Sequence, residues 1–160
     1  MKRGANGFTL VELVVVITII GLLSTIGISS YTNILKESKY TKTRTEIGEI
    51  AKLADLGRNL SGKTMLEITG NGCSECACRS NQIKLAACAA ANKTAITKIG
   101  AAAKNIIEID TIAFDEWENP YLINENEGER ANSCDTDNIA SAGPNGIYYD
   151  TDDVIYNIPT

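Results

Sequence analysis

Residues 4–20 read GANGFTLVELVVVITII and begin an apolar run that continues to Tyr31. Within residues 8–31 only Glu12 is charged. As a helix this run would measure about 36 Å, enough to cross a bilayer core of about 30 Å. A charge placed in hydrocarbon costs several kcal/mol. We therefore predict a transmembrane helix over residues 8–31, in which the carboxylate of Glu12 needs a polar partner.

The composition favours one modest folded domain behind this run. The chain has 160 residues, of which 44 % are hydrophobic and 22 % charged, and this is enough apolar content for a packed core. The formal net charge of −5 argues against a nucleic-acid partner. The chain has no histidine, so the commonest general base is missing. We therefore expect no enzymatic activity.

Residues 32–61 continue the helix with a different pattern. Apolar residues recur there at steps of three and four: Ile47, Ile50, Leu53, Leu56 and Leu60. This spacing places them on one helix face, which a folded domain must cover. Gly62 follows as a helix stop. We predict one helix from about Thr9 to Leu60, apolar all round in its first half and amphipathic in its second.

Residues 62–160 are predicted to form a globular head. Residues 62–108 are rich in cysteine and alanine. Residues 83–107 are predicted to be helical, and Asn92 and Gly100 are the two places where this helix could break. Residues 109–160 carry the short β-prone runs TIAF, PYLI, GIYY and VIYNI, separated by turn-forming residues. The predicted fold class is α+β, with a small antiparallel sheet packed on the long helix and a disulfide-bearing Ala-rich helical insert.

Five cysteines follow the apolar run: Cys73, Cys76, Cys78, Cys88 and Cys134. A zinc ribbon needs two well-spaced C-x-x-C pairs, and this sequence has one. A thiol oxidoreductase that used Cys73 and Cys76 would need a βαβ context, which the sequence lacks. Disulfides formed in an oxidising compartment are the favoured interpretation. We expect one bond from the loop 73–78 to Cys88 and a second from that loop to Cys134.

Side chains with oxygen atoms crowd the C-terminal region: Asp135, Asp137, Asn145, Asp150, Asp152 and Asp153. Hard oxygen ligands in a loop bent by Gly and Pro suit Ca²⁺. The spacing does not match an EF-hand, which needs a glutamate at its twelfth position. Taken alone, the spacing favours a solvated acidic loop over a calcium site.

The segment G-FTLVE at the head of an apolar helix resembles the prepilin signal of type IV pilins and of type II secretion pseudopilins. The resemblance implies that a prepilin peptidase cuts between Gly7 and Phe8, removes residues 1–7 and methylates the amino group of Phe8. Glu12 then takes the family's fifth mature position. Its carboxylate is expected to meet the amino terminus of a neighbouring subunit, or its own, during assembly. Residues 27–30, GISS, lack the proline that many members carry there.

The head is similar to that of major pseudopilins in three short segments. The matching residues are Asp115, Trp117, Pro120 and Tyr121, then Ser141, Gly143, Asn145 and Gly146, and finally Asp152 and Asp153. The resemblance implies Ca²⁺ bound by side chains of Asn145 and of Asp152 or Asp153, with backbone carbonyls around Ile139 to Ser141. Glu116 replaces a usual proline, and Asn145 stands where aspartate is common, which would lower the affinity.

The resemblance implies a structural subunit of a type IV pilus-like surface filament. Such a subunit is a single-pass membrane protein before assembly and part of an extracellular or periplasmic filament afterwards. Its expected partners are further copies of itself, the membrane, the prepilin peptidase and an inner-membrane assembly platform. A major pseudopilin of a type II secretion system is the first alternative. A minor pilin or a membrane-anchored binding module is the second.

Overall fold

The computed structural model describes residues 7–78, 83–84, 86–106, 112–125 and 137–158. Helix α1 spans Leu10–Ser61 and is 52 residues long, which confirms the prediction of one long N-terminal helix. It ends at Gly62, which adopts a left-handed backbone conformation at φ +66° and donates its N–H to the carbonyl of Arg58 at 2.8 Å. Glycine adopts this conformation without steric cost, so it closes the helix as expected.

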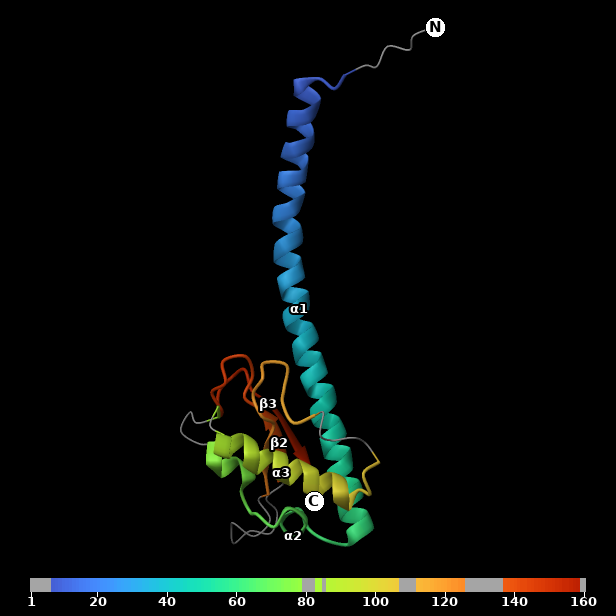
Figure 1. Ribbon diagram of the computed structural model, residues 1–160, viewed down its shortest axis with the longest axis vertical. Helices are drawn as coiled ribbons and strands as arrows, with labels where there is room; N and C mark the ends of the chain where they lie inside the picture. The colour runs from blue at the N-terminus through green and yellow to red at the C-terminus, as the bar shows by residue number, and fades with distance from the viewer. Residues whose placement is uncertain (1–6, 79–82, 85, 107–111, 126–136, 159–160) are drawn as a thin grey trace. The chain divides into compact units, whose positions relative to one another are not determined.

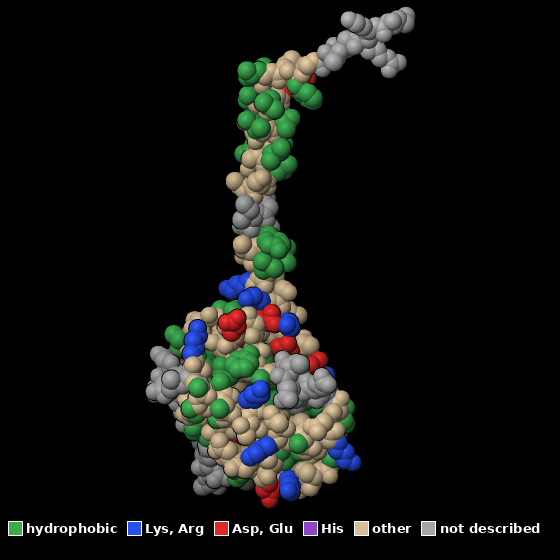
Figure 2. Space-filling view, in the orientation of Figure 1, with side chains coloured by type: hydrophobic (Ala, Val, Ile, Leu, Met, Phe, Trp, Pro, Cys, Tyr) green, Lys and Arg blue, Asp and Glu red, His purple; other side chains and the backbone are tan. Residues whose placement is uncertain are grey.

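The chain divides into two compact units, residues 1–38 and residues 39–160, and α1 contributes to both. In the first unit the described large apolar side chains of α1 are exposed, as the hydrophobic surface along the helix in Figure 2 shows. Leu10 is 78 % exposed and Leu22 is 70 % exposed. Over the part of the chain that the structure describes, no helix has the length and apolarity needed to cross a membrane. The predicted transmembrane character of residues 8–31 is therefore not confirmed.

The second unit packs the amphipathic part of α1 into a head domain (Figure 1). After α1 come helix α2 (Met65–Thr69), the 3₁₀ helix η1 (Ser74–Cys78) and helix α3 (Ala86–Ala102). A capping box begins α2, because Thr64 and Glu67 satisfy each other's backbone N–H groups. Helix α3 runs unbroken through Asn92 and Gly100, so the break considered in the sequence does not occur.

The described part of the head contains a three-stranded antiparallel sheet in the order β1-β2-β3. The strands are β1 (Leu122–Asn124), β2 (Asp137–Ser141) and β3 (Val154–Ile158). The predicted run VIYNI coincides with β3, and the last two residues of PYLI begin β1. The run TIAF supplies one isolated bridge, from Phe114 to Pro120, and GIYY forms no strand. Strand β2 was not predicted, since its sequence DNIAS is polar at three of its five positions.

One buried apolar cluster joins α1, α2, α3 and the sheet. Its members include Ile47, Ile50, Leu53, Met65, Ile96, Ile99, Tyr121, Ile123, Ile139 and Ile158. Three of the five periodic residues of α1 belong to it, which is the reason for their spacing. Gly57 allows α1 and α3 to approach closely, since a Cβ there would lie 3.1 Å from the Cβ of Ala102. These contacts confirm the predicted α+β fold.

Candidate functional site

The start of α1 places Thr9 against Glu12. Oε2 of Glu12 accepts hydrogen bonds from the backbone N–H and from the hydroxyl of Thr9, both at 2.8 Å. Oγ1 of Thr9 accepts in return from the N–H of Glu12 at 3.2 Å. This reciprocal pair is a capping box, in which the N-cap side chain and the third helical residue satisfy each other's N–H groups. Glu12 therefore has a polar partner within its own chain.

This capping box was not predicted, although its signal is present in the sequence. A threonine followed three residues later by glutamate, ahead of an apolar run, is the signature of a capping box. Gly7 and Phe8 precede the helix and are exposed, Phe8 to 89 %. Exposed backbone outside regular structure is where proteases cut most readily. Cleavage after Gly7 and methylation of Phe8 stay predictions.

The disulfides of the described residues lie in and around η1. Cys78 bonds to Cys88 in α3, as predicted for the loop 73–78. Cys73 bonds to Cys76 within that loop, so the predicted second bond, from the loop to Cys134, is wrong. The 3₁₀ turn of η1 brings the Cα atoms of Cys73 and Cys76 to 5.3 Å, which is within the range of a disulfide. The two residues are three apart in the sequence, so their bond needs no contact with a distant segment. Cys134 lies outside the described residues.

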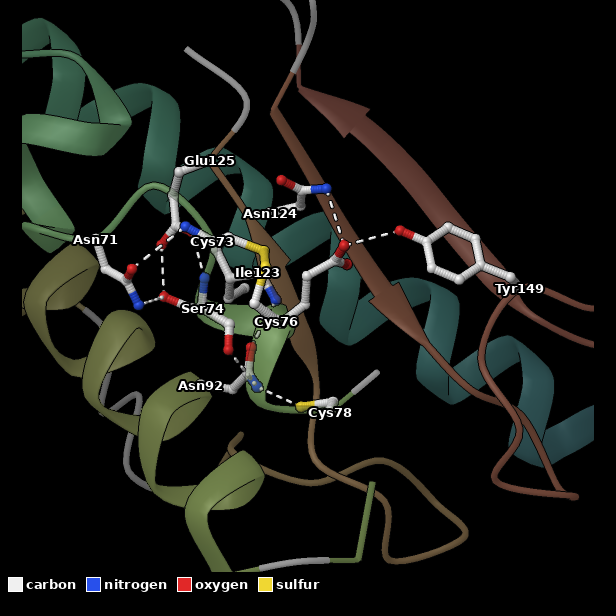
Figure 3. The surroundings of a disulfide bond; sticks show 11 residues. Asn71, Cys73, Ser74, Cys76, Cys78, Asn92, Ile123, Asn124, Glu125 and Tyr149 are labelled. Carbon is white, nitrogen blue, oxygen red and sulfur yellow. Dashed lines mark hydrogen bonds between the residues drawn. A yellow bond between two sulfur atoms is a disulfide. The ribbon is translucent and has the colours of Figure 1, made fainter. Parts of the chain in front are cut away.

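The Cys73–Cys76 ring encloses two buried polar residues, Ser74 and Glu75. Figure 3 shows Ser74 beside Glu125, which follows β1. The N–H and hydroxyl of Ser74 donate to the two carboxylate oxygens of Glu125 at 2.8 and 2.7 Å. Oε1 of Glu75 accepts from the side-chain amide of Asn124 at 2.9 Å and from the hydroxyl of Tyr149 at 2.8 Å. The ring thus joins η1 to the residues that end β1.

Asn92 connects the same region to α3. Its Oδ1 accepts the backbone N–H of Ile123 in β1 at 2.8 Å, and its amide donates to the carbonyls of Cys88 and Ser74 at 3.0 and 3.3 Å. The amide also lies 3.1 Å from Sγ of Cys78. Burial raises the pKa of Glu125, and the hydrogen bonds from Ser74 counteract this rise. The network is buried, so its geometry is held by packing as well as by hydrogen bonds.

The three segments that resemble pseudopilins come together in the fold. Oδ2 of Asp115 accepts from the hydroxyl of Ser141 at 2.6 Å, and its Oδ1 accepts from the N–H of Asn119 at 2.9 Å. The amide of Asn119 donates to the carbonyl of Gly143 at 2.8 Å. Gly143 in turn adopts φ +60°, and a Cβ there would lie only 2.6 Å from the carbonyl oxygen of Asp152. Burial raises the pKa of Asp115, and these hydrogen bonds oppose the rise.

The aromatic residues of the first segment serve packing. The ring of Trp117 meets Tyr40 of α1 edge-on, with the centroids 4.8 Å apart. Tyr121 is fully buried and donates its hydroxyl to Oε2 of Glu46 at 2.6 Å. Burial, assisted by the charge of Glu46, raises the pKa of Tyr121, so this phenol stays protonated and donates. The turn 115–121 is thereby attached to the amphipathic part of α1.

The acidic loop precedes β3 and contains three carboxylates that lie close together. Oxygen atoms of Asp150, Asp152 and Asp153 all lie within 4.8 Å of one another. The amide nitrogen of Asn145 donates to Asp150 and Asp152, both at 2.7 Å, while its Oδ1 accepts the N–H of Ile147 at 2.6 Å. The hydrogen bond with Asp150 raises the pKa of Asp152, and burial raises the pKa of Asp153.

This arrangement matches only part of the predicted calcium ligand set. Asp152 and Asp153 come together, and Asp150 joins them. Asn145 presents its amide nitrogen to the carboxylates rather than its oxygen. Ile139 lies in the central strand, paired with Ile123 on one side and Tyr156 on the other, and this pairing occupies its backbone groups. Ser141 pairs with Val154, next to Asp153, and its side chain serves Asp115.

Comparison with known proteins identifies the N-terminal segment. The prokaryotic N-terminal methylation motif matches residues 2–28. This stretch contains Gly7, Phe8, Thr9 and Glu12, and it ends within the apolar half of α1. The match therefore covers the predicted cleavage residues and the capping box, and it does not extend to the head.

Relatives among characterised proteins agree with this motif. A probable minor fimbrial protein of Dichelobacter nodosus is 38 % identical over 76 residues, covering 48 % of this chain and 45 % of the relative. The type IV major fimbrial protein FimA of the same organism is 40 % identical over 50 residues, covering 31 % of this chain and 32 % of the relative. The chain therefore spans less than half the length of these relatives. No solved structure matches the chain. The chain thus carries the N-terminal methylation motif and is similar, over part of its length, to type IV fimbrial subunits.

Proposed function

We propose that this chain is a structural subunit of a type IV pilus-like surface filament. The observation that carries the proposal is the apolar surface of α1, where large apolar side chains between Leu10 and Leu23 are 44 to 78 % exposed. A helix that is apolar all round is stable when neighbouring helices or lipid cover it. In a filament, the same segment of other copies would provide this cover. Before assembly, the membrane would provide it.

Glu12 is proposed to act in assembly. Removal of residues 1–7 would create a charged amino group at Phe8, directly before Thr9. The amino group of a neighbouring subunit, or of the same one, would then pair with the Glu12 carboxylate, which the lone chain satisfies through Thr9. Removing one partner of a buried ion pair costs about 3–5 kcal/mol. Such a pair would favour a subunit docked at the correct axial step.

Two variants separate the two contributions of Glu12. Glu12→Gln keeps an acceptor oxygen for the capping box but removes the charge, whereas Glu12→Ala removes both. We expect both variants to abolish filament assembly, while Glu12→Gln retains the helical start. Wild-type filament yield from Glu12→Ala would exclude this role. Wild-type yield from Glu12→Gln alone would show that the capping box, and not the charge, is what assembly needs.

The filament itself is tested on sheared surface material. Electron microscopy should show filaments that contain this chain, and sequencing of the subunit should begin at N-methylated Phe8. A subunit that still carries residues 1–7 within filaments would contradict the proposed processing. A Gly7→Leu variant serves as the matched control, because it should leave the head folded while blocking cleavage. Accumulation of the uncut chain in the membrane fraction is the expected result.

A major pseudopilin of a type II secretion system is the alternative, favoured by the head residues around Asp115 and Gly143. The names of the relatives, which include both major and minor fimbrial proteins, favour a pilus. A minor pilin that ends or decorates a filament is a further alternative. Neighbouring genes for a retraction ATPase would support the pilus, whereas genes for a secretin and a secretion ATPase would support the pseudopilus. The proposed assembly partners are an inner-membrane platform and the prepilin peptidase.

Calcium binding by the acidic loop is a second proposal. Three crowded carboxylates within 4.8 Å supply the hard oxygen donors that Ca²⁺ prefers. The hydrogen bond with Asp150 raises the pKa of Asp152, and burial raises the pKa of Asp153. Bound Ca²⁺ would neutralise this crowding and hold the loop. We expect millimolar Ca²⁺ to raise the melting temperature and EDTA to reverse the rise. An equal response in an Asp152→Asn variant, or none in the wild type, would contradict this site.

A further inference from the structure

The two disulfides around η1 differ in their access to solvent. Cys78 is 1 % exposed and Cys88 is fully buried. Cys76 is exposed and Cys73 partly exposed. Thiol–disulfide exchange proceeds by attack of a thiolate on one sulfur of the bond, so its rate depends on access to that sulfur. In the folded head, therefore, an external thiol can reach one of these bonds and not the other.

The accessible bond closes the ring that holds Ser74 and Glu75 in place. Both side chains are buried, with exposures of 1 % and 0 %. Ser74 donates twice to Glu125, and Glu75 accepts from Asn124 and Tyr149. The ring is exposed at Cys76. Figure 3 shows Ser74 beside Glu125, which follows β1, and Glu75 accepts from Asn124, the last residue of β1. The exposed disulfide and these buried contacts therefore lie within the same four residues.

The buried bond secures the other end of η1. Cys78–Cys88 joins the last residue of η1 to α3, and the Asn92 amide lies 3.1 Å from Sγ of Cys78. Opening of the Cys73–Cys76 bond would leave this attachment intact. The contacts that would loosen are those made by Ser74 and Glu75. The two bonds therefore differ in role. Cys73–Cys76 is open to solvent and to an external thiol, whereas Cys78–Cys88 is buried and holds η1 on α3.

We propose that Cys73–Cys76 is a thiol–disulfide exchange site whose reaction partner is an external dithiol. A thiolate of the dithiol attacks Sγ of Cys76, the bond between the two cysteines breaks, and Cys73 leaves as a thiolate that takes up a proton. The second thiolate of the dithiol then attacks the dithiol sulfur that is bonded to Cys76 in the mixed disulfide. Cys76 leaves as a thiolate and is protonated. The protein disulfide is reduced by two electrons, and the partner dithiol becomes a disulfide.

Reduction at this site loosens the link between η1 and β1 without unfolding the head. The four-residue ring restricts the backbone of Ser74, so its opening enlarges the number of conformations available to that residue. The N–H of Ser74, which donates to Glu125 in the oxidised protein, should then open to solvent more often. This effect is independent of the proposed filament function, since it concerns the head alone.

Limited reduction of the full chain tests the proposal. The chain, carrying Cys134→Ser so that only the four bonded cysteines contribute, is treated in detergent with dithiothreitol under native conditions. Samples are quenched with iodoacetamide and digested for mass spectrometry. We expect Cys73 and Cys76 to become alkylated at least tenfold faster than Cys78 and Cys88. Equal rates for the two pairs, or faster alkylation of Cys78 and Cys88, would overturn the assignment.

Hydrogen exchange tests the consequence for the fold. In the selectively reduced chain, the Ser74 amide should exchange at least tenfold faster than in the oxidised chain, while the amides of the α3 core keep their protection. A Cys73→Ser/Cys76→Ser variant should reproduce the reduced pattern without dithiothreitol. Unchanged protection of Ser74 in the reduced chain would refute the coupling between the ring and β1. A loss of protection throughout the head would refute the difference in role between the two bonds.

Discussion

Replacement of Asn92 by alanine should destabilise the head far more than replacement of an exposed asparagine. The side chain is fully buried in α3. It accepts the N–H of Ile123 at 2.8 Å and donates to the carbonyl of Ser74 at 3.3 Å. Among the described strands β1 lies at the edge of the sheet, so the N–H of Ile123 is not bonded to another described strand. It donates instead to the side-chain oxygen of Asn92.

The magnitude follows from the groups that lose their partners. A buried polar group left without a hydrogen bond costs about 1–3 kcal/mol. Two such groups, the N–H of Ile123 and the carbonyl of Ser74, give a loss of about 2–6 kcal/mol. With a urea dependence of about 2 kcal/mol per molar, a loss of about 3 kcal/mol lowers the unfolding midpoint by about 1.5 M.

The assay is urea unfolding of the full chain in detergent. Trp117, the single tryptophan of the chain, reports on the head because its ring contacts Tyr40. Asn59→Ala is the matched control: Asn59 is exposed on α1, where its amide donates to the carbonyl of Asp55 at 2.9 Å. That change should stay within about 0.5 kcal/mol of wild type. A midpoint shift from Asn92→Ala no larger than that from Asn59→Ala would show that the buried amide is not needed.

Three further predictions concern the head. Gly143→Ala should cost at least about 3 kcal/mol, because φ is +60° and the new Cβ would lie 2.6 Å from the carbonyl oxygen of Asp152; Gly62→Ala, with φ +66° and open space, should cost only about 1–2 kcal/mol in the same thermal melts. Burial raises the pKa of Glu125, so the folded head binds this proton more tightly than the unfolded chain, and the contribution to stability falls as pH rises from the ordinary value of about 4.3. Urea midpoints between pH 4.5 and 7 should show this decline, and it should weaken in Glu125→Gln. Tyr121→Phe removes a 2.6 Å hydrogen bond to a carboxylate on α1 and should cost about 1.5–3 kcal/mol by urea midpoint; a loss below about 0.5 kcal/mol would show that water replaces the phenol.

Local patterns in the sequence were sufficient for the long helix and for its end. The steps of three and four from Ile47 to Leu53 predicted the face that packs in the core, and Gly62 predicted the stop. Both are properties of a few neighbouring residues, so they depend little on the rest of the fold. The capping box of Thr9 and Glu12 was equally local and could have been predicted.

Strand β2 and the second disulfide could not be predicted in the same way. The sequence DNIAS is a strand because β1 and β3 pair with it on both sides, and β propensity depends on such context. Several pairings of five cysteines satisfy the same spacing. The 3₁₀ turn of η1 brings Cys73 to Cys76, and this local geometry decided the pairing.

From the sequence it was already clear that an apolar helix begins after Gly7, that it carries one carboxylate, and that an α+β head follows it. These features rest on periodicity and on residues within one or two turns of each other. The partners of the buried polar residues, by contrast, became known from the folded chain. Ser74, Asn92 and Glu125 lie far apart in the sequence, and they meet because α3, η1 and β1 pack around one buried network. Burial makes those contacts necessary, and burial is a property of the whole fold.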